Sequence, residues 1–311
     1  MEFIYKVKIS NEKYKSILFV ESLYSLSLYD FYNKGLYDTL VISRTGIFSE
    51  NIKNNIENFL ELNSKILPPS RFEKIIMSHG RIPSRFRELN QYVKSGMEIY
   101  GHDHIKYSAF FFSTGLNIVE DGSRNYICNK RIKDFFWSFL GMPYPLMGYS
   151  MKNKKILLSG INDIPSKIKS RVILIDRLSF LESLNTAKYN CNVNISEKFT
   201  LLITQPLSED RIVTEKEKLS IYKELLYKDK NKLVIKPHPR EKTDYKKYFS
   251  DAIIINNDGL VESLIGHKNL VKVVTLCSTG INSFKLRRNL DIVEGDMNKY
   301  PKIKNFLNIK G

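Results

Sequence analysis

The residues best suited to chemistry follow an apolar run that ends at Lys236 and that we expect to be a strand. His238 comes next, after Pro237, and a second basic side chain, Arg240, follows it. Prolines on both sides of the histidine fix the backbone, so the chain must leave the strand at once and present the imidazole at its carboxyl end. The basic side chains could hold an anionic group while His238 donates a hydrogen bond or a proton. The alternative interpretation is a rigid turn with a solvated histidine.

Hydroxyl side chains follow a second apolar run, 271–276. Ser278 and Thr279 precede a glycine at the point where a helix would begin, and backbone N–H groups with two hydroxyls suit a phosphate. The alternative is an ordinary helix cap. Glu262, between two predicted strands, could accept hydrogen bonds from a ribose diol or lie on a surface helix. Ligands of open parallel sheets bind at the carboxyl ends of strands, so these loops could face one crevice.

Carboxylates follow two other predicted strands. Glu120 and Asp121 precede Gly122, and one of the two could act as a base or bind a sugar. Adjacent residues of an extended chain point opposite ways, so at most one would face a cleft. The loop from Gln205 to Asp210 ends another strand, and Asp210 could be a general base near the histidine. For both segments an acidic turn is the alternative.

Metal binding is not predicted. His102 and His104 share a face of an extended chain, but no third and fourth ligand stands at a supporting spacing. Three cysteines, Cys128, Cys191 and Cys277, lack CxxC spacing, which argues against a zinc knuckle and a disulfide framework and fits a reducing cytosol.

The elements that must position these residues alternate along the chain, which predicts an α/β protein with mainly parallel sheets and helices on both faces. Strands are expected at 16–20, 37–43, 72–77, 97–100, 116–119, 171–175, 199–204, 232–236, 252–255 and 271–276. Helices are expected at 22–32, from Ser49 through Leu60, from Ser84, at 105–113 and from Thr214, where Glu217 completes a capping box. Lys, Ser, Gly and Asn between 150 and 169 predict a linker there, so we expect domains at 1–155 and 156–311.

The amino-acid composition limits the classes of molecule that the protein is expected to bind. The 311 residues carry 49 Lys and Arg against 33 Asp and Glu, a formal charge of +16 that favours nucleic acid, phosphorylated small molecules or an anionic membrane. Dispersed lysines and the lack of a recognition motif argue against nucleic acid. GxGxxG, P-loop and GxSxG motifs are missing, which disfavours dehydrogenases, P-loop enzymes and α/β-hydrolases.

No apolar segment reaches the roughly 18–20 residues of a membrane span. The uncharged, aromatic-rich stretch 135–149 predicts a buried loop and short helix, with an interfacial membrane segment as the alternative.

Three short motifs stand in a fixed order: Glu120-Asp121-Gly122, Lys236-Pro237-His238-Pro239 and Ser278-Thr279. That order resembles the bacterial sialyltransferases. The stretch Gln205 to Asp210, followed by Lys236 to Glu241, is most similar to the lipooligosaccharide sialyltransferases, glycosyltransferase family 52. The resemblance implies a GT-B fold, in which an N-terminal acceptor-side domain (1–155) and a C-terminal nucleotide-sugar-binding domain (156–311) are both Rossmann-like and face a cleft. The last residues could pack back on the first domain.

The resemblance also implies an activity. The donor would be CMP-sialic acid and the acceptor a terminal galactose of a bacterial surface glycan, lipooligosaccharide or capsule, with inversion, an alpha-2,3 linkage, no cofactor and no metal. We expect a cytoplasmic homodimer, with peripheral contact to the cytoplasmic face of the inner membrane.

Residue roles follow from the same resemblance. His238 would be the general acid or the hydrogen-bond donor to the departing CMP phosphate, Ser278 and Thr279 would hold that phosphate, and Glu262 would hold the ribose. The base would be Asp210 by its position in this family, or Asp121 as in other sialyltransferase families. The remaining expected substrate-binding residues are Glu120, Gly122, Gln205, Lys236, Pro237 and Arg240.

Two alternatives remain open. One is another GT-B transferase of surface polysaccharide synthesis that uses a UDP-sugar or CMP-Kdo. The other is a basic nucleic-acid-binding protein without catalysis, which the dispersed lysines disfavour.

Overall fold

The structure is a computed structural model that describes residues 2–10, 13–93, 96–128, 130–185, 188–191, 193–255, 259–278 and 280–310, with side chains of the last helix as far as Phe306. It consists of two compact units, Met1–Phe180 and Leu181–Gly311.

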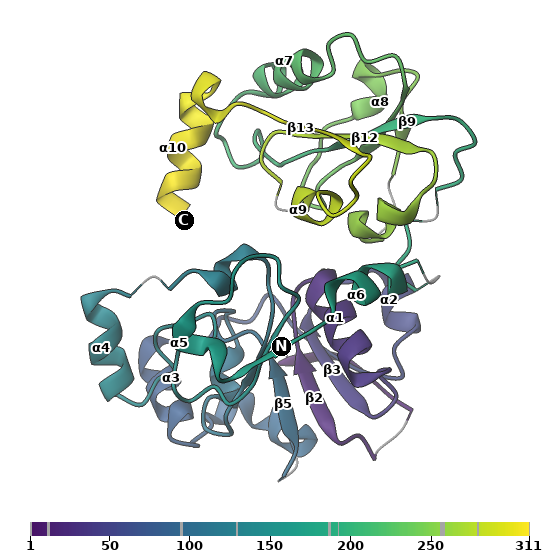
Figure 1. Cartoon of the computed structure of the whole chain (residues 1–311). Helices are drawn as coiled ribbons and strands as arrows, with labels where there is room; N and C mark the ends of the chain where they lie inside the picture. The colour runs from purple at the N-terminus through teal and green to yellow at the C-terminus, as the bar shows by residue number, and fades with distance from the viewer. Residues whose placement is uncertain are drawn as a thin grey trace. The chain divides into compact units, whose positions relative to one another are not determined.

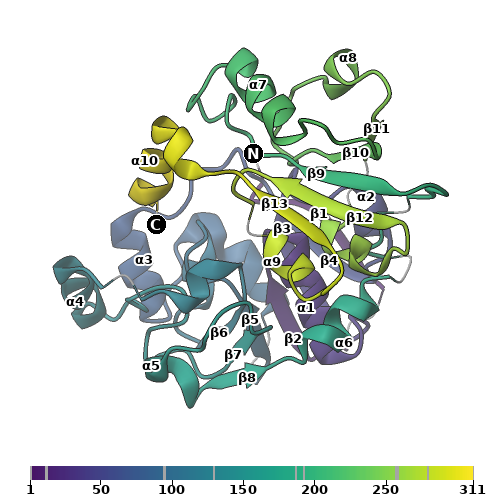
Figure 2. The same ribbon diagram turned by 45° about the horizontal axis from the view of Figure 1, so that its top comes forward.

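The first unit is built on a sheet with the strand order β1-β4-β3-β2-β5-β6-β7-β8. Its strands are β1 Ile4–Ile9, β2 Ser16–Phe19, β3 Thr39–Arg44, β4 Asn58–Leu62, β5 Glu98–Gly101, β6 Asn117–Val119, β7 Ile156–Leu158 and β8 Val172–Leu174. Only the β1–β4 pairing is antiparallel among the described residues. The helices are α1 Leu23–Asn33, α2 Glu50–Asn54, α3 Arg71–Ser78, α4 Ile132–Phe139 and α5 Ser166–Lys169, with short 3-10 helices η1 Ser84–Tyr92, η2 Ser108–Phe111 and η3 Ser123–Tyr126. The helix α6 Arg177–Ser183 crosses the boundary between the two units. Figure 2 shows β5, β6, β7 and β8 following one another across this sheet.

The second unit holds a parallel sheet in the order β11-β10-β9-β12-β13. Its strands are β9 Phe199–Ile203, β10 Lys232–Lys236, β11 Ile253–Ile254, β12 Leu270–Thr275 and β13 Asp291–Glu294. The helices are α7 Glu215–Leu225, α8 Tyr245–Tyr248, α9 Ile281–Phe284 and α10 Pro301–Lys310, with 3-10 helices η4 Val261–Gly266 and η5 Met297–Lys299.

The central strands of the second unit divide their side chains between two cores, as the pleat requires. The core under α7 and α8 contains Leu202, Ile235, Val274, Leu219, Tyr222 and Tyr245. The core under α9 contains Leu201, Val234, Val273, Ile281 and Phe284. Figure 1 shows α7 and α8 on one side of the sheet and α9 on the other. Helices on both faces of a parallel sheet are the predicted α/β arrangement, which is confirmed.

The strand expected at 72–77 is wrong, because these residues form α3. The Ser70 hydroxyl accepts the backbone N–H of Glu73, and the Glu73 carboxylate accepts the backbone N–H of Ser70. This capping box satisfies donors at the helix start, so it favours a helix over a strand.

The long helix expected from Ser49 through Leu60 is also wrong. Its first part forms the short α2, and 58–62 form β4, which is buried along its whole length between β1 and β3. A strand that is buried on both faces carries apolar residues in succession, and such a run imitates helical spacing.

The expected domain boundary after residue 155 is wrong as well. β7 pairs with β6 and β8 pairs with β7, so these strands complete the first sheet, and the units divide between Phe180 and Leu181. The polar stretch 150–169 therefore surrounds a strand of the first unit and is no linker. At the other end of the chain, Ile303 of α10 is buried in the core under α7 and α8.

The stretch 135–149 is buried only in part: Met142 and Tyr149 in its loop are buried, as expected, but the helix before them is not. Ile132, Phe135 and Phe139 on α4 are 97%, 83% and 82% exposed, whereas Asp134 on the opposite face is buried. This helix therefore turns its apolar face to solvent and its carboxylate inward, the reverse of an ordinary surface helix.

Candidate functional site

Three loops meet at the carboxyl edge of the second sheet. β9 lies between β10 and β12, and the three strands are parallel. Their ends therefore bring the loops that begin at Gln205, Pro237 and Cys277 to one edge, where open parallel sheets bind ligands.

The imidazole of His238 is oriented by two backbone contacts. The backbone N–H of His238 donates to Oε2 of Glu241 at 2.7 Å, and the ring Nδ1 accepts the backbone N–H of Arg240 at 3.2 Å. In the neutral ring the proton must then be on Nε2. Burial lowers the pKa of His238, and the positive charge of Arg240 lowers it further. The residue is thus a neutral Nε2–H donor near pH 7.

The Glu241 side chain fastens this loop to the rest of the unit. Besides the His238 N–H, it accepts hydrogen bonds from the Thr204 hydroxyl at the end of β9, from the Tyr245 hydroxyl at 2.6 Å and from Lys218 Nζ at 3.1 Å. Sequence reasoning quoted this glutamate within a motif but gave it no role.

Lys218 of α7 was missed altogether. Its side chain is fully buried and donates to Glu209 at 3.2 Å, to Glu241 and to Thr243 at 2.6 Å. The available signal was its helical spacing to Tyr222, which places a lysine on the apolar side of the predicted helix.

Asp210 lies beside the histidine loop. Its two carboxylate oxygens accept Nη1 and Nη2 of Arg240 at 2.6 and 3.1 Å, a bidentate pair. The neighbouring Glu209 accepts the backbone N–H of Lys242 at 2.9 Å as well as Lys218. Burial alone would raise the pKa of Glu209, but these hydrogen bonds outweigh it and lower that pKa to about 2.

The loop after β12 places a hydroxyl and a carboxylate together. Ser278 accepts the N–H of Gly280 at 3.3 Å and donates its own N–H to Thr275. A Cβ atom on Gly280 would lie 3.4 Å from Glu262 Oε1 and 3.5 Å from Ser278 Oγ, so both side chains flank this glycine. Thr279 lies outside the described residues.

Lys236 and Glu262 act on a common neighbour, the thiol of Cys191. Burial is the largest effect on the pKa of this thiol and raises it, the charge of Lys236 lowers it, and the charge of Glu262 raises it.

The two other expected substrate-binding residues of this unit are Gln205 and Pro237. Gln205, just after β9, donates its backbone N–H to the Tyr222 hydroxyl at 2.8 Å. Pro237 is half-buried between Lys236 and the histidine.

In the first unit, the acidic pair after β6 is divided, as the extended chain predicts. Glu120 is fully buried and accepts the N–H of Ser159 at 2.5 Å and the hydroxyl of Tyr126 at 2.9 Å, and burial raises its pKa. Asp121 is 30% exposed, so it alone of the two can meet a solute. Gly122 follows with a φ of 82°, a conformation that favours glycine.

Asp121 has two histidine neighbours that the sequence did not connect to it. Its Oδ2 lies 3.1 Å from Nε2 of His104 and 4.0 Å from Nδ1 of His102. Burial would raise the pKa of Asp121, but the hydrogen bond and charge of His104 and the charge of His102 lower it to about 2. The third donor that spacing failed to supply comes from the neighbouring strand, since β5 and β6 pair in parallel.

Solved structures define the class of this fold. The GT-B domain of a sialyltransferase from Photobacterium damselae is 12% identical, covers 94% of this chain and 97% of that chain, and gives a TM-score of 0.51. A UDP-GlcNAc 2-epimerase from Methanocaldococcus jannaschii in complex with UDP-GlcNAc and UDP is 16% identical, with coverages of 94% and 92% and a TM-score of 0.50. A wall teichoic acid polymerase is 13% identical, with coverages of 93% and 72% and a TM-score of 0.50. The protein has a GT-B fold.

The model of glycosyltransferase family 52 matches residues 43–294. The chain belongs to this family and is a glycosyltransferase, which confirms the resemblance that its ordered motifs carry. An uncharacterized protein from Haemophilus influenzae is 33% identical over 256 residues, which are 76% of this chain and 82% of that protein.

Proposed function

We propose that this family 52 enzyme transfers sialic acid from CMP-sialic acid to a terminal galactose of a bacterial surface glycan, lipooligosaccharide or capsule, with inversion and an alpha-2,3 linkage. The observation that carries the proposal is one edge of the sheet, where a neutral His238 with basic Lys236 and Arg240 at the end of β10, and the Ser278 hydroxyl after β12, stand on either side of β9. CMP-sialic acid has a phosphate and a carboxylate, and basic side chains attract both.

The first half of the reaction is departure of CMP. The bond between the anomeric carbon and a phosphate oxygen breaks, and its electron pair stays on the phosphate. The Nε2–H of His238 donates to that oxygen, and Ser278 and Thr279 hold the phosphate while Glu262 accepts the ribose hydroxyls. In this proposal the side chains themselves stabilise the negative charge that develops on the leaving phosphate. The proposed transfer therefore uses no metal and no cofactor.

In the second half the galactose hydroxyl oxygen attacks the anomeric carbon and forms the new glycosidic bond, and its proton must pass to a base. We assign this role to Asp210, which lies beside the histidine loop through its pair with Arg240. When the donor binds, Arg240 turns to its anionic groups and releases the Asp210 carboxylate to accept the proton. Asp121 is the alternative base, but its pKa of about 2 makes it a weak one.

The experiment that tests this function compares donors. The full chain is incubated with a galactoside and CMP-sialic acid, CMP-Kdo or a UDP-sugar, and release of nucleotide is measured. We expect CMP-sialic acid to be turned over fastest and only with the galactoside present. We also expect CMP to raise the melting temperature more than UDP or GDP, because a ligand stabilises the fold that binds it. Faster turnover of CMP-Kdo or a UDP-sugar would replace this proposal with the corresponding transferase.

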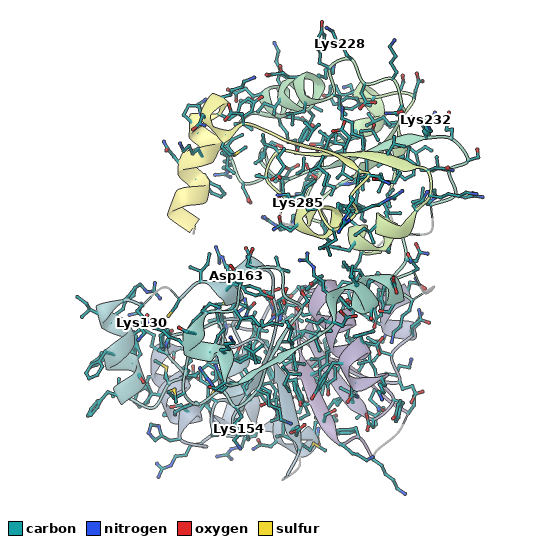
Figure 3. The ribbon with its side chains drawn as sticks, in the orientation of Figure 1. Lys130, Lys154, Asp163, Lys228, Lys232 and Lys285 are labelled. Atoms are coloured by element: carbon teal, nitrogen blue, oxygen red, sulfur yellow. The ribbon has the colours of Figure 1, made fainter. Side chains whose placement is uncertain are left out.

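A peripheral membrane contact belongs to the same proposal. No helix among the described residues has the length and apolar character to cross a bilayer. However, α4 exposes Ile132, Phe135 and Phe139, and basic residues lie at its start, including Lys130 beside the helix in Figure 3 and Lys133 in its first turn. Exposed aromatic side chains next to lysines suit the interface of an anionic bilayer.

The predicted homodimer is proposed to form elsewhere on the surface. A symmetric contact through α4 would bring Lys130 and Lys133 close to their own copies, and like charges at an interface are unfavourable. Light scattering of the purified protein measures the dimer directly.

A further inference from the structure

The proposed reaction leaves one cluster of the first unit without a use. His102 and His104 follow β5, and Asp121 follows the neighbouring strand β6. One possible ligand atom of each residue lies within 4.8 Å of those of the other two. Oδ2 of Asp121 is 4.0 Å from Nδ1 of His102 and 3.1 Å from Nε2 of His104. The rings of the two histidines are stacked, with centroids 5.3 Å apart.

The hydrogen bonds of Ser25 determine which nitrogen of His102 carries the proton. The Ser25 hydroxyl is 2.6 Å from the carbonyl oxygen of Glu120, which can only accept, so the single hydroxyl proton is donated there. Nε2 of His102 lies 2.9 Å from the same hydroxyl and must therefore donate to it. Nδ1 of the neutral His102 ring consequently carries a lone pair.

That lone pair points at nothing that can donate to it. The His102 side chain is 1% exposed, and its Nδ1 has no hydrogen-bond partner among the described residues. The carboxylate oxygen of Asp121, 4.0 Å away, is another acceptor and too distant for a hydrogen bond. Two acceptors that face each other inside a protein call for a positive species between them.

We propose that His102, His104 and Asp121 bind a divalent transition-metal ion of the zinc class. Two imidazole nitrogens and one carboxylate oxygen are a ligand set that such ions prefer, and three protein ligands leave a fourth position for a solvent molecule. His104 and Asp121 are 23% and 30% exposed, so the ion enters from solvent.

Further features agree with a metal site. The bond from His102 to Ser25, which in turn binds the Glu120 carbonyl, is the second layer of contacts that orients metal-bound histidines. The ion would take the place of the hydrogen that His104 shares with Asp121. A carboxylate that binds the ion cannot also serve as a base, so in the loaded protein Asp210 is the remaining base. The metal site itself does not depend on the proposed sialyl transfer.

The test measures metal binding directly. The full chain is treated with a chelator, freed of it and titrated with Zn²⁺ by calorimetry, and with Co²⁺ by visible absorption. We expect one saturable site per chain, and a Co²⁺ spectrum without the charge-transfer band that a thiolate ligand would give. His104→Gln and Asp121→Asn should each weaken binding at least about tenfold, and Ser25→Ala should weaken it about tenfold.

The matched control is His79→Gln, because His79 contacts the Ile75 carbonyl in the same unit and lies outside the cluster. It should bind Zn²⁺ like the wild type. Both ligand variants change partly exposed side chains, and their melting curves report whether they fold. Lack of a saturable site, unchanged affinity in folded His104→Gln and Asp121→Asn, or a thiolate band would each overturn the proposal.

Discussion

At the scale of single residues, His238 is held by contacts that fix its ring before any substrate arrives. Its backbone N–H donates to Glu241, and its ring Nδ1 accepts the backbone N–H of Arg240. The ring Nε2–H is therefore left to donate to a substrate. The strand, the prolines and the flanking charges were readable from the sequence. The choice of tautomer was not, because it depends on a backbone contact two residues away.

His238→Ala should lower the rate of CMP release from CMP-sialic acid by about 10²–10⁴-fold, since this is the range for loss of one general acid. Initial rates at saturating donor and galactoside measure the effect. His79→Gln, in the first unit, serves as the control and should keep the wild-type rate. Wild-type turnover by His238→Ala would remove the histidine from the mechanism.

The two candidate bases can be separated by a pair of matched variants. Asp210→Asn should lower turnover by about 10²–10⁴-fold, whereas Asp121→Asn should stay within about threefold of wild type. The physical reason is that Asp210 lies at the edge that holds His238, and the low pKa of Asp121 makes it a poor proton acceptor. The reverse pattern in the same rate assay would assign the base to Asp121.

At the scale of elements, the second unit was predictable and the first was less so. The strands at β9, β10 and β12 follow from short apolar runs, and the Thr214–Glu217 capping box marks the start of α7. The wrong predictions in the first unit fall where the spacing of apolar residues along the chain suggests one element and the packing of the folded chain requires another. β4 has helical spacing but is buried between two strands, and only the sheet order shows this.

The buried Lys218 ties α7 to the loops that carry His238 and Asp210. Lys218→Met should lower the free energy of unfolding by about 3–5 kcal/mol at pH 7, because it leaves the buried Glu241 carboxylate and the partly buried Glu209 carboxylate without their cation. Urea unfolding followed by circular dichroism measures it. The control is Lys216→Met, an exposed lysine of the same helix, which should change stability by less than about 0.5 kcal/mol.

The same variant predicts a pH dependence. The pKa of Glu209 is about 2 in the folded protein and lies near 4.5 when unperturbed. A lowered carboxyl pKa stabilises the fold above pH 4.5, and that stabilisation disappears as the pH falls from about 4.5 to about 2. Lys218 supplies part of this lowering, after the backbone N–H of Lys242 and the Ser208 hydroxyl, so part of the difference in stability between wild type and Lys218→Met should disappear over this interval. A difference that stays constant down to pH 2 would mean that the lysine acts through packing alone.

At the scale of the whole molecule, the motifs identified the family and the fold, but the site within the first unit needed the structure. Asp121 and His104 are separated along the chain and come together only because β5 and β6 are neighbours. The boundary between the units was misplaced because the three-residue strand β7 was not predicted, and the strand expected at 171–175, which is β8, was assigned to the second domain.

At this scale, the net charge of +16 and the exposed apolar side chains of α4 together predict binding to anionic membranes. Phe135→Ser combined with Phe139→Ser should reduce the fraction of protein that sediments with anionic liposomes at least about tenfold, because two exposed rings are lost from the contact. Tyr227→Ser, an exposed aromatic of the second unit, is the control. Added salt should weaken binding of the wild type. Equal sedimentation of wild type and the α4 variant would exclude α4 as the contact.

The central claim, sialyl transfer to galactose, is tested most directly by the mass of the product. The full chain is incubated with CMP-sialic acid and a galactose-terminated acceptor, and the acceptor is analysed by mass spectrometry. The account predicts an acceptor heavier by one sialic acid residue, formed by the wild type and about 10²–10⁴-fold more slowly by His238→Ala. An unmodified acceptor, in a reaction where the same protein transfers a sugar from CMP-Kdo or a UDP-sugar, would contradict it.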